Sequence, residues 1–188
     1  MRIVCTRSGI TIDQCAYLNT VLERFQLTNT KSAPTPLPAR WDPKANTEQA
    51  TAAEITRYQS IIGSILYLMI GTCPDIAFAV THLSQFSTNP TKDHYWAAVH
   101  ICRYLVGSWD YKLIYSQDAD KGLVAFTNSS WAADKIRHCS ITSYFFKVAN
   151  GIISWHSHAQ KTVALFYRSR VHGNLGLLLT SDLDQNPD

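Results

Sequence analysis

The sequence lacks several features that would at once define its class of protein. Its five cysteines are odd in number and widely scattered, and no CxxC pair occurs. We therefore expect neither a zinc ribbon nor a disulfide framework, and interpret the cysteines as reduced, buried thiols. The absence of a GxSxG nucleophile elbow argues against a serine hydrolase of that type.

Charge and long hydrophobic runs are also scarce. Charged residues make up 16% of the chain and the formal net charge is +3, which is compatible with nucleic acid without indicating it. The most apolar run, residues 61–70, is too short to span a bilayer, and the N-terminus lacks the apolar core of a secretory signal. We expect a protein of the cytoplasm or nucleus that is neither secreted nor membrane-bound.

The residues that are present predict a folded chain whose first part is mainly helical. Hydrophobic residues make up 46% of 188, enough to bury a core. Residues 2–12 are typical of a short hairpin, and residues 33–43 carry four prolines and predict an extended linker. Apolar residues at helical spacing predict four helices, the first capped by Asp13. The expected helices cover residues 13–26, 56–70, 75–87 and 92–106.

From residue 110 onward the pattern is typical of strands. Alternating and β-branched residues predict an antiparallel set between about 111 and 158, with Asn150 and Gly151 forming a tight turn. The expected strands cover residues 112–115, 123–127, 144–148 and 152–156. His156 and His158 share a face, where a solvent-facing pair is favoured over a metal site. Trp96, Trp131 and Trp155 could stack on bases, although core positions are the simpler interpretation.

Long stretches of the chain resemble copia-type retrotransposon Pol polyproteins. Residues 57–80, RYQSIIGSILYLMIGTCPDIAFAV, resemble the family's YxSxxGSLxYLxxGTRPDIAFAV block. Residues 16–37, 83–115 and 150–165 resemble further segments of the same polyproteins, so that the similarity covers roughly residues 1–165. The resemblance implies a region that follows the reverse-transcriptase palm, without the palm's paired aspartates.

The resemblance implies an α+β fold in which a helical thumb and connection segment precedes an incomplete ribonuclease H-like antiparallel sheet. We expect the packing face of this sheet, which includes Trp131, Phe145 and Ile153, to lack its normal helical cover. It divides the chain into a palm-end hairpin and thumb helix, a Pro-rich linker, connection helices, a partial ribonuclease H-like domain, and a frameshifted, poorly ordered tail. The corresponding ranges are residues 1–33, 34–55, 56–108, 109–165 and 166–188.

The resemblance also implies that the ribonuclease H site is degenerate. Intact relatives use Asp and Glu side chains to hold two magnesium ions, with a first pattern like YSDADWAGD. The equivalent here is FTNSSWAAD, residues 126–134, in which Asn128 and Ser130 replace the two aspartates. The family's next carboxylate lies in SSTEAEY, yet no glutamate follows Glu54 in this chain. We therefore expect no catalytic residues, no bound metal and no cofactor.

The tail carries a trace of the missing motif in another reading frame. One permitted codon choice for residues 165–173, read one base later, encodes Ser-Ser-Thr-Glu-Ala-Glu-Tyr-Met. In the shifted frame only the middle base of each triplet is free to vary, because the protein sequence fixes the other two. This agreement is therefore difficult to reach by chance. A frameshift next to Leu165 explains it, and a genuine alternative exon remains open.

These features lead to three hypotheses for function. The first is a decayed Pol fragment without reverse-transcriptase or ribonuclease H activity. The second is a non-catalytic module that binds an RNA–DNA hybrid or RNA weakly, through cations such as Lys135, Arg137 and Lys147. The third, a residual enzyme using Asp134 with Asp110 or Asp118, is disfavoured because these positions do not match the family pattern. Oligomeric state does not follow from the sequence.

Overall fold

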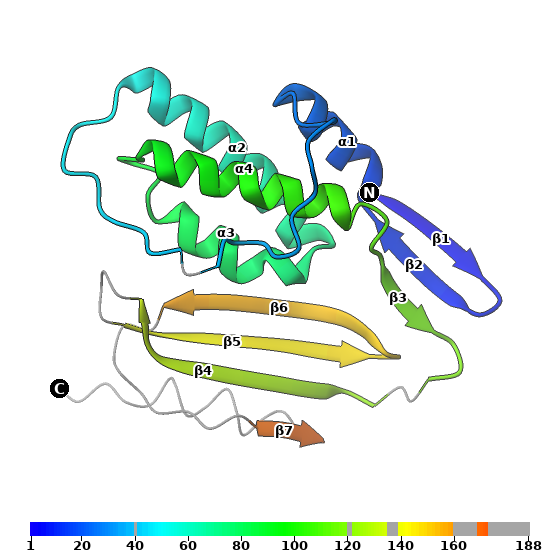
Figure 1. The fold of residues 1–188 in the computed structure, drawn as a ribbon. Coiled ribbons are helices and arrows are strands. Elements are labelled where there is room, and N and C mark those ends of the chain that lie inside the picture. The colour runs from blue at the N-terminus through cyan, green and yellow to red at the C-terminus, as the bar shows by residue number, and fades with distance from the viewer. Residues whose placement is uncertain (40, 120–121, 135–138, 160–168, 173–188) are drawn as a thin grey trace.

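The chain folds into a layer of helices beside antiparallel strands (Figure 1). A computed structural model describes residues 1–188 except 40, 120–121, 135–138, 160–168 and 173–188. Helices and strands occupy largely separate parts of the sequence, which confirms the expected α+β class.

The four expected helices are confirmed, with shifted ends. They are α1 (Cys15–Arg24), α2 (Ala52–Gly71), α3 (Ala77–Ser84, preceded by the short 3-10 helix η1, Pro74–Ile76) and α4 (Lys92–Gly107). Gln14, and not Asp13, is the N-cap residue of α1, but the Asp13 carboxylate still accepts the Cys15 amide hydrogen of the first turn at 3.3 Å. The same carboxylate is buried in an ion pair with Arg2 at 2.9 Å.

The main core lies between the helices. Tyr58, Ile61, Ile65 and Leu68 of α2 are fully buried or nearly so, because this helix is apolar around most of its second half. They pack with buried residues of α1, α3 and α4 in one continuous cluster. The Tyr58 hydroxyl is satisfied by donating to the Leu83 carbonyl at 2.7 Å.

The Pro-rich segment crosses the surface of α4 instead of hanging free. The Ala33 amide donates to the Arg103 carbonyl at 3.1 Å, and His100 Nε2 lies 3.1 Å from the Thr35 carbonyl oxygen. Trp41 then packs edge-on against His82 and His94, with ring centroids 5.8 and 6.2 Å apart. These contacts attach the linker to the helical layer along its length.

The N-terminal hairpin acquires a third strand from far along the chain. Strands β1 (Arg2–Thr6) and β2 (Gly9–Asp13) pair as expected, but β3 (Leu113–Ser116) joins β2 in the order β1-β2-β3. Ile12 lies opposite Leu113 in this sheet. The prediction that residues 112–115 belong to the C-terminal set of strands is therefore wrong.

The second sheet contains β4 (Val124–Asp134), β5 (Cys139–Val148), β6 (Gly151–Ala159) and β7 (Ser169–His172) in the order β6-β5-β4-β7. Its last hairpin turns at Ala149 and Asn150, both with positive φ (50° and 63°), one residue earlier than expected. Strand β7 comes from the segment expected to be a poorly ordered tail, the rest of which lies outside the described residues.

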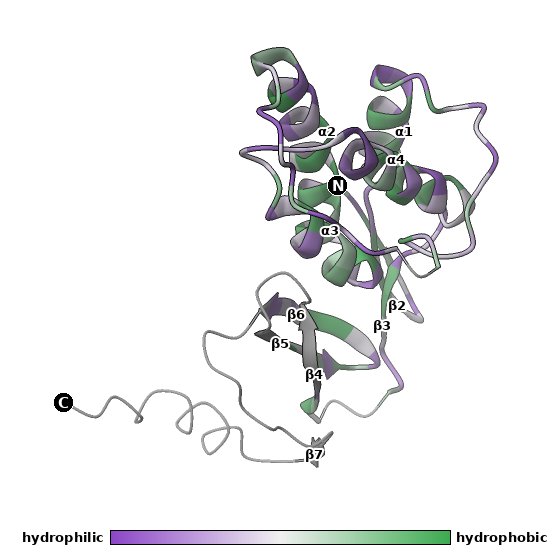
Figure 2. Ribbon diagram, turned by 60° about the vertical axis from the view of Figure 1, so that its left-hand side comes forward, coloured by the Kyte–Doolittle hydropathy of each residue, from purple (hydrophilic) through white to green (hydrophobic). Residues whose placement is uncertain are grey.

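One face of the second sheet meets the helices, with α3 lying against β6 in both views (Figures 1 and 2). The Trp155 indole donates to the Met69 carbonyl at 2.9 Å, and Ile141 and Ser157 are buried. Phe145, opposite Trp155 on this face, stacks on Phe126 at 4.6 Å. The expectation that this face lacks helical cover is wrong at β6, although Ile153 is 50% exposed and the side chain of Trp131 lies outside the described residues.

Candidate functional site

The predicted degenerate positions lie on β4. Asn128 is exposed and pairs with Ser143 of β5, while Ser130 pairs with Ile141 before the ladder becomes irregular. Asn128 thus lies in the regular part of the β4–β5 ladder, and the side chain of Ser130 lies outside the described residues.

Of the three predicted basic residues, Lys147 lies in the described part of the chain. Lys147 pairs with Val124, at the opposite end of the β4–β5 ladder from Ser130. It lies about 13 Å along β5 from Ser143, the partner of Asn128. Lys135 and Arg137 lie outside the described residues.

The described residues contain neither a metal-ligand cluster nor a membrane-spanning helix. Among the described residues, no group of three or more His, Cys, Asp and Glu side chains could hold a metal ion. His156 and His158 share a face as predicted, with ring centroids 4.9 Å apart. No helix within the described ranges has the length and hydrophobicity needed to cross a bilayer.

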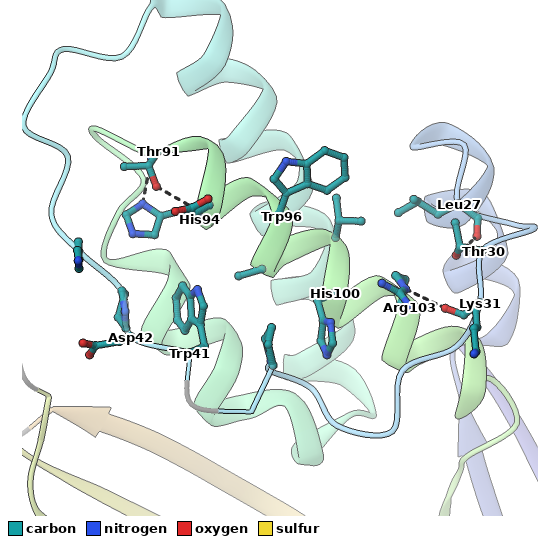
Figure 3. A pocket seen from close by; sticks show the side chains of 16 residues that line it. Leu27, Thr30, Lys31, Trp41, Asp42, Thr91, His94, Trp96, His100 and Arg103 are labelled. Atoms are coloured by element: carbon teal, nitrogen blue, oxygen red, sulfur yellow. Dashed lines mark hydrogen bonds between the residues drawn. The ribbon is translucent and has the colours of Figure 1, made fainter.

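A large hollow lies elsewhere, between α4 and the Pro-rich linker (Figure 3). This groove has a volume of about 760 Å³ and is walled by Pro38, Trp41 and Lys44 on one side and by α4 on the other. A second hollow of about 240 Å³ contains Arg57, Lys92 and Tyr95. Trp96 lines both hollows, so its indole stands between them.

Four side chains form a line along α4, which we call the α4 stripe: Lys92, Trp96, His100 and Arg103. Their spacing of four, four and three residues brings them to one side of a helix. The stripe extends about 16 Å along the axis. Trp96 is 64% exposed, unlike Val99, Cys102 and Leu105 of the same helix, which are buried. The expectation of a core position for Trp96 is therefore wrong.

The electrostatics of the groove are set by cations with few local partners. Lys31, Lys44 and Lys92 are exposed, and the Arg103 Nε donates to the Lys31 carbonyl at 2.8 Å. Burial lowers the pKa of the His100 imidazole, so this ring is neutral near pH 7. Fixed positive charge thus comes from lysine and arginine at both ends of the stripe.

On the other side of Trp96, Arg57 stacks over the Tyr95 ring at 4.5 Å and donates to its hydroxyl at 3.1 Å. Glu54 is committed to the α2 cap, where the Thr51 amide and hydroxyl donate to it, and these hydrogen bonds lower its pKa. The carboxylate therefore stays ionised, and Lys92 is among the charges that lower its pKa.

Sequence reasoning missed the α4 stripe, although a signal was available. The pattern KxxxWxxxHxxR within residues 92–103 has the spacing of one helix face. A tryptophan among polar residues on that face indicates an exposed aromatic group. The linker wall, in contrast, has no sequence signal, because it depends on how the prolines direct the chain.

Comparisons with known proteins identify the class of protein. No family model and no solved structure matches the chain. It is 37% identical over 173 residues to the retrovirus-related Pol polyprotein from transposon TNT 1-94 of Nicotiana tabacum, covering 88% of this chain and 13% of that protein. It is 33% identical over 157 residues to the Pol polyprotein from transposon RE1 of Arabidopsis thaliana, covering 83% and 10%.

A shorter relative matches part of the chain. The secreted RxLR effector protein 161 of Plasmopara viticola is 40% identical over 108 residues, covering 57% of this chain and 76% of that protein. The matches to the TNT 1-94 and RE1 polyproteins establish that the chain is a homologue of the retrovirus-related Pol polyproteins of plant transposons. The chain spans 10–13% of the length of these Pol polyproteins.

Proposed function

We propose that the chain is a catalytically inactive remnant of the reverse-transcriptase and ribonuclease H region of a copia-type Pol polyprotein. The Pol relatives support this proposal, as does the order of elements along the chain. Helices α1 to α4 correspond to the expected thumb and connection segment, and β4 to β6 correspond to the ribonuclease H-like sheet.

The observation that carries the proposal is Asn128 on β4. It occupies the position at which the family pattern has its first aspartate, and Ser130 replaces the second. An amide keeps the shape of aspartate but not its charge. Two divalent cations held close together need several carboxylates to offset their repulsion. Without these charges the strand lacks the means to bind the metal pair.

A hybrid-cleavage assay tests the proposal. Purified chain is incubated with a labelled RNA–DNA hybrid and magnesium, beside an intact ribonuclease H as positive control. We expect no cleavage, and no rescue by Asn128→Asp alone, because the helix glutamate of the family is also missing. Asn128→Asp combined with an SSTEAEY segment after Leu165 and the rest of the family's domain is the minimal repair.

The same assay can overturn the proposal. Cleavage by the unmodified chain that Asn128→Ala abolishes would show an active site built on this strand. Asn150→Asp serves as a matched control, since it adds a carboxylate at an exposed turn residue outside the site. In the repaired chain, equal cleavage with Asp at position 128 or at position 150 alone would mean that position 128 has no special role.

A second candidate function is a non-catalytic nucleic-acid-binding module. The exposed cations and the exposed indole of Trp96 in the groove favour it. Such binding is electrostatic, so the affinity should fall steeply as salt is raised. Filter binding of an RNA–DNA hybrid and of single-stranded RNA at two salt concentrations tests this candidate, and the absence of binding to both at low salt contradicts it.

A further inference from the structure

We propose that the α4 stripe and its two hollows bind single-stranded nucleic acid, with a base stacked on Trp96 and the flanking phosphates held by lysine and arginine. This inference rests on the nucleic-acid-binding candidate function and assigns it a site. The site differs from the basic group predicted from the sequence around residues 135–147.

The first argument is the exposure of Trp96. An indole that is 64% exposed in the middle of a helix leaves a large apolar surface in water. Its described ring contact is with Tyr95, at 6.0 Å and an interplanar angle of 72°, which is an edge contact rather than a stack. The position between two hollows leaves room for a planar ligand beside the ring.

The second argument is the charge around that indole. Five cationic side chains line the two hollows: Lys31, Lys44, Arg57, Lys92 and Arg103. Three carboxylates line them as well: Asp42, Glu54 and Asp93. Glu54 is engaged in the α2 cap, and Asp93 lies in the first turn of α4, where the helix dipole favours an anion. The remaining excess of positive charge is complementary to a polyanion.

The third argument concerns the form of the nucleic acid. The bases of a duplex are stacked inside the helix, so they cannot reach an aromatic ring that lines a concave groove. A single strand can turn one base toward such a ring while its backbone follows neighbouring cations. The walls formed by Trp41 and Lys44 on one side and Arg57 on the other therefore favour a strand over a duplex.

Fluorescence anisotropy with the full chain tests this inference. Labelled oligo(U) and oligo(dT) strands are titrated, with a blunt DNA duplex and an RNA–DNA hybrid as separate arms. We expect Trp96→Ala to weaken binding of the single strands by about tenfold or more, and Trp96→Phe to weaken it less. Comparing oligo(U) with oligo(dT) shows whether RNA or DNA is preferred.

Matched controls come from the chain itself. Trp109 is also exposed, at 56%, but lies outside both hollows, so Trp109→Ala should leave the affinity unchanged. Lys44→Gln should reduce the salt dependence of binding, whereas Lys112→Gln, at another exposed lysine, should not. Circular dichroism confirms that each variant retains the fold.

The outcomes separate this inference from the function on which it rests. Equal effects of Trp96→Ala and Trp109→Ala, or equal affinity for strand and duplex, overturn the site while leaving nucleic-acid binding in place. Absence of binding to every oligonucleotide at low salt overturns both. Neither result bears on catalytic inactivity, which the cleavage assay tests separately.

Discussion

At the scale of single residues, the fold controls the charge of His94 most directly. The side chain is 1% exposed, its ring stacks on Phe86 at 3.8 Å, and its Nδ1 accepts the Thr91 amide hydrogen at 3.0 Å. Burial is the main cause that lowers the pKa of this imidazole, nearby Asp93 opposes it, and His82 adds to the lowering. The folded protein therefore favours the neutral ring.

A pH dependence of stability follows from this lowered pKa. Below about pH 6.5 the unfolded chain takes up a proton that folded His94 resists, so the free energy of unfolding should fall as the pH decreases. The slope for one proton is at most about 1.4 kcal/mol per pH unit. Urea unfolding at about pH 7.5 and about pH 5.5 measures it.

The matched variant for this prediction is His94→Gln. Its amide can still accept the Thr91 N–H, as glutamine does in a capping box, but it does not titrate. The variant should lose part of the pH dependence of the parent. An equally steep dependence in both proteins would assign the effect to other groups.

At the scale of elements, the start of α2 depends on a reciprocal cap. The Glu54 amide donates to Thr51 Oγ1 at 3.3 Å, and the Thr51 amide donates to Glu54 Oε2 at 2.9 Å. Thr51→Ala removes half of this capping box and should lower the free energy of unfolding by about 1 kcal/mol. Denaturant titration measures the change.

Thr56→Ala is the control for the α2 cap. Thr56 is exposed inside the same helix and donates only to the Ala52 carbonyl one turn back, at 2.9 Å. Because alanine has the higher helix propensity, this substitution should be neutral or slightly stabilising. Equal losses from both substitutions would show that the cap contributes nothing specific.

At the scale of the whole molecule, polar contacts help to join the second sheet to the rest of the described chain. Besides the Trp155 bond to Met69, the Tyr115 hydroxyl donates to the Ile152 carbonyl at 2.7 Å and links the two sheets. Trp155→Phe keeps a ring but leaves the Met69 carbonyl without this donor. We expect a loss of about 1 kcal/mol, or about 2–4 °C in Tm.

The helical signal in circular dichroism tests whether this contact couples the two parts. If sheet and helices unfold together, Trp155→Phe lowers the melting temperature of the helices, while Trp109→Phe on an exposed indole does not. Unchanged melting of the helices in Trp155→Phe would mean that the two parts unfold independently.

Local sequence determined the helices and the hairpins, because capping residues, prolines and apolar spacing act within a few residues of each other. The positions of α1 to α4 and the β1–β2 hairpin were predictable on this basis. The replacement of the family's aspartate by Asn128 was likewise predictable from the sequence alone. The T-x-x-E box at Thr51 was visible in the sequence but was overlooked.

Only the tertiary structure decided which distant segments meet. Strand β3 pairs with β2 across roughly a hundred residues, a choice that depends on packing and that no local pattern encodes. The turn at Ala149 and Asn150 differs by one residue from the expected Asn-Gly turn, because the strand register selects the residues that take positive φ. The groove likewise requires the linker to lie across α4, and the packing of the helices leaves Trp96 exposed beside cations, where a core position was expected.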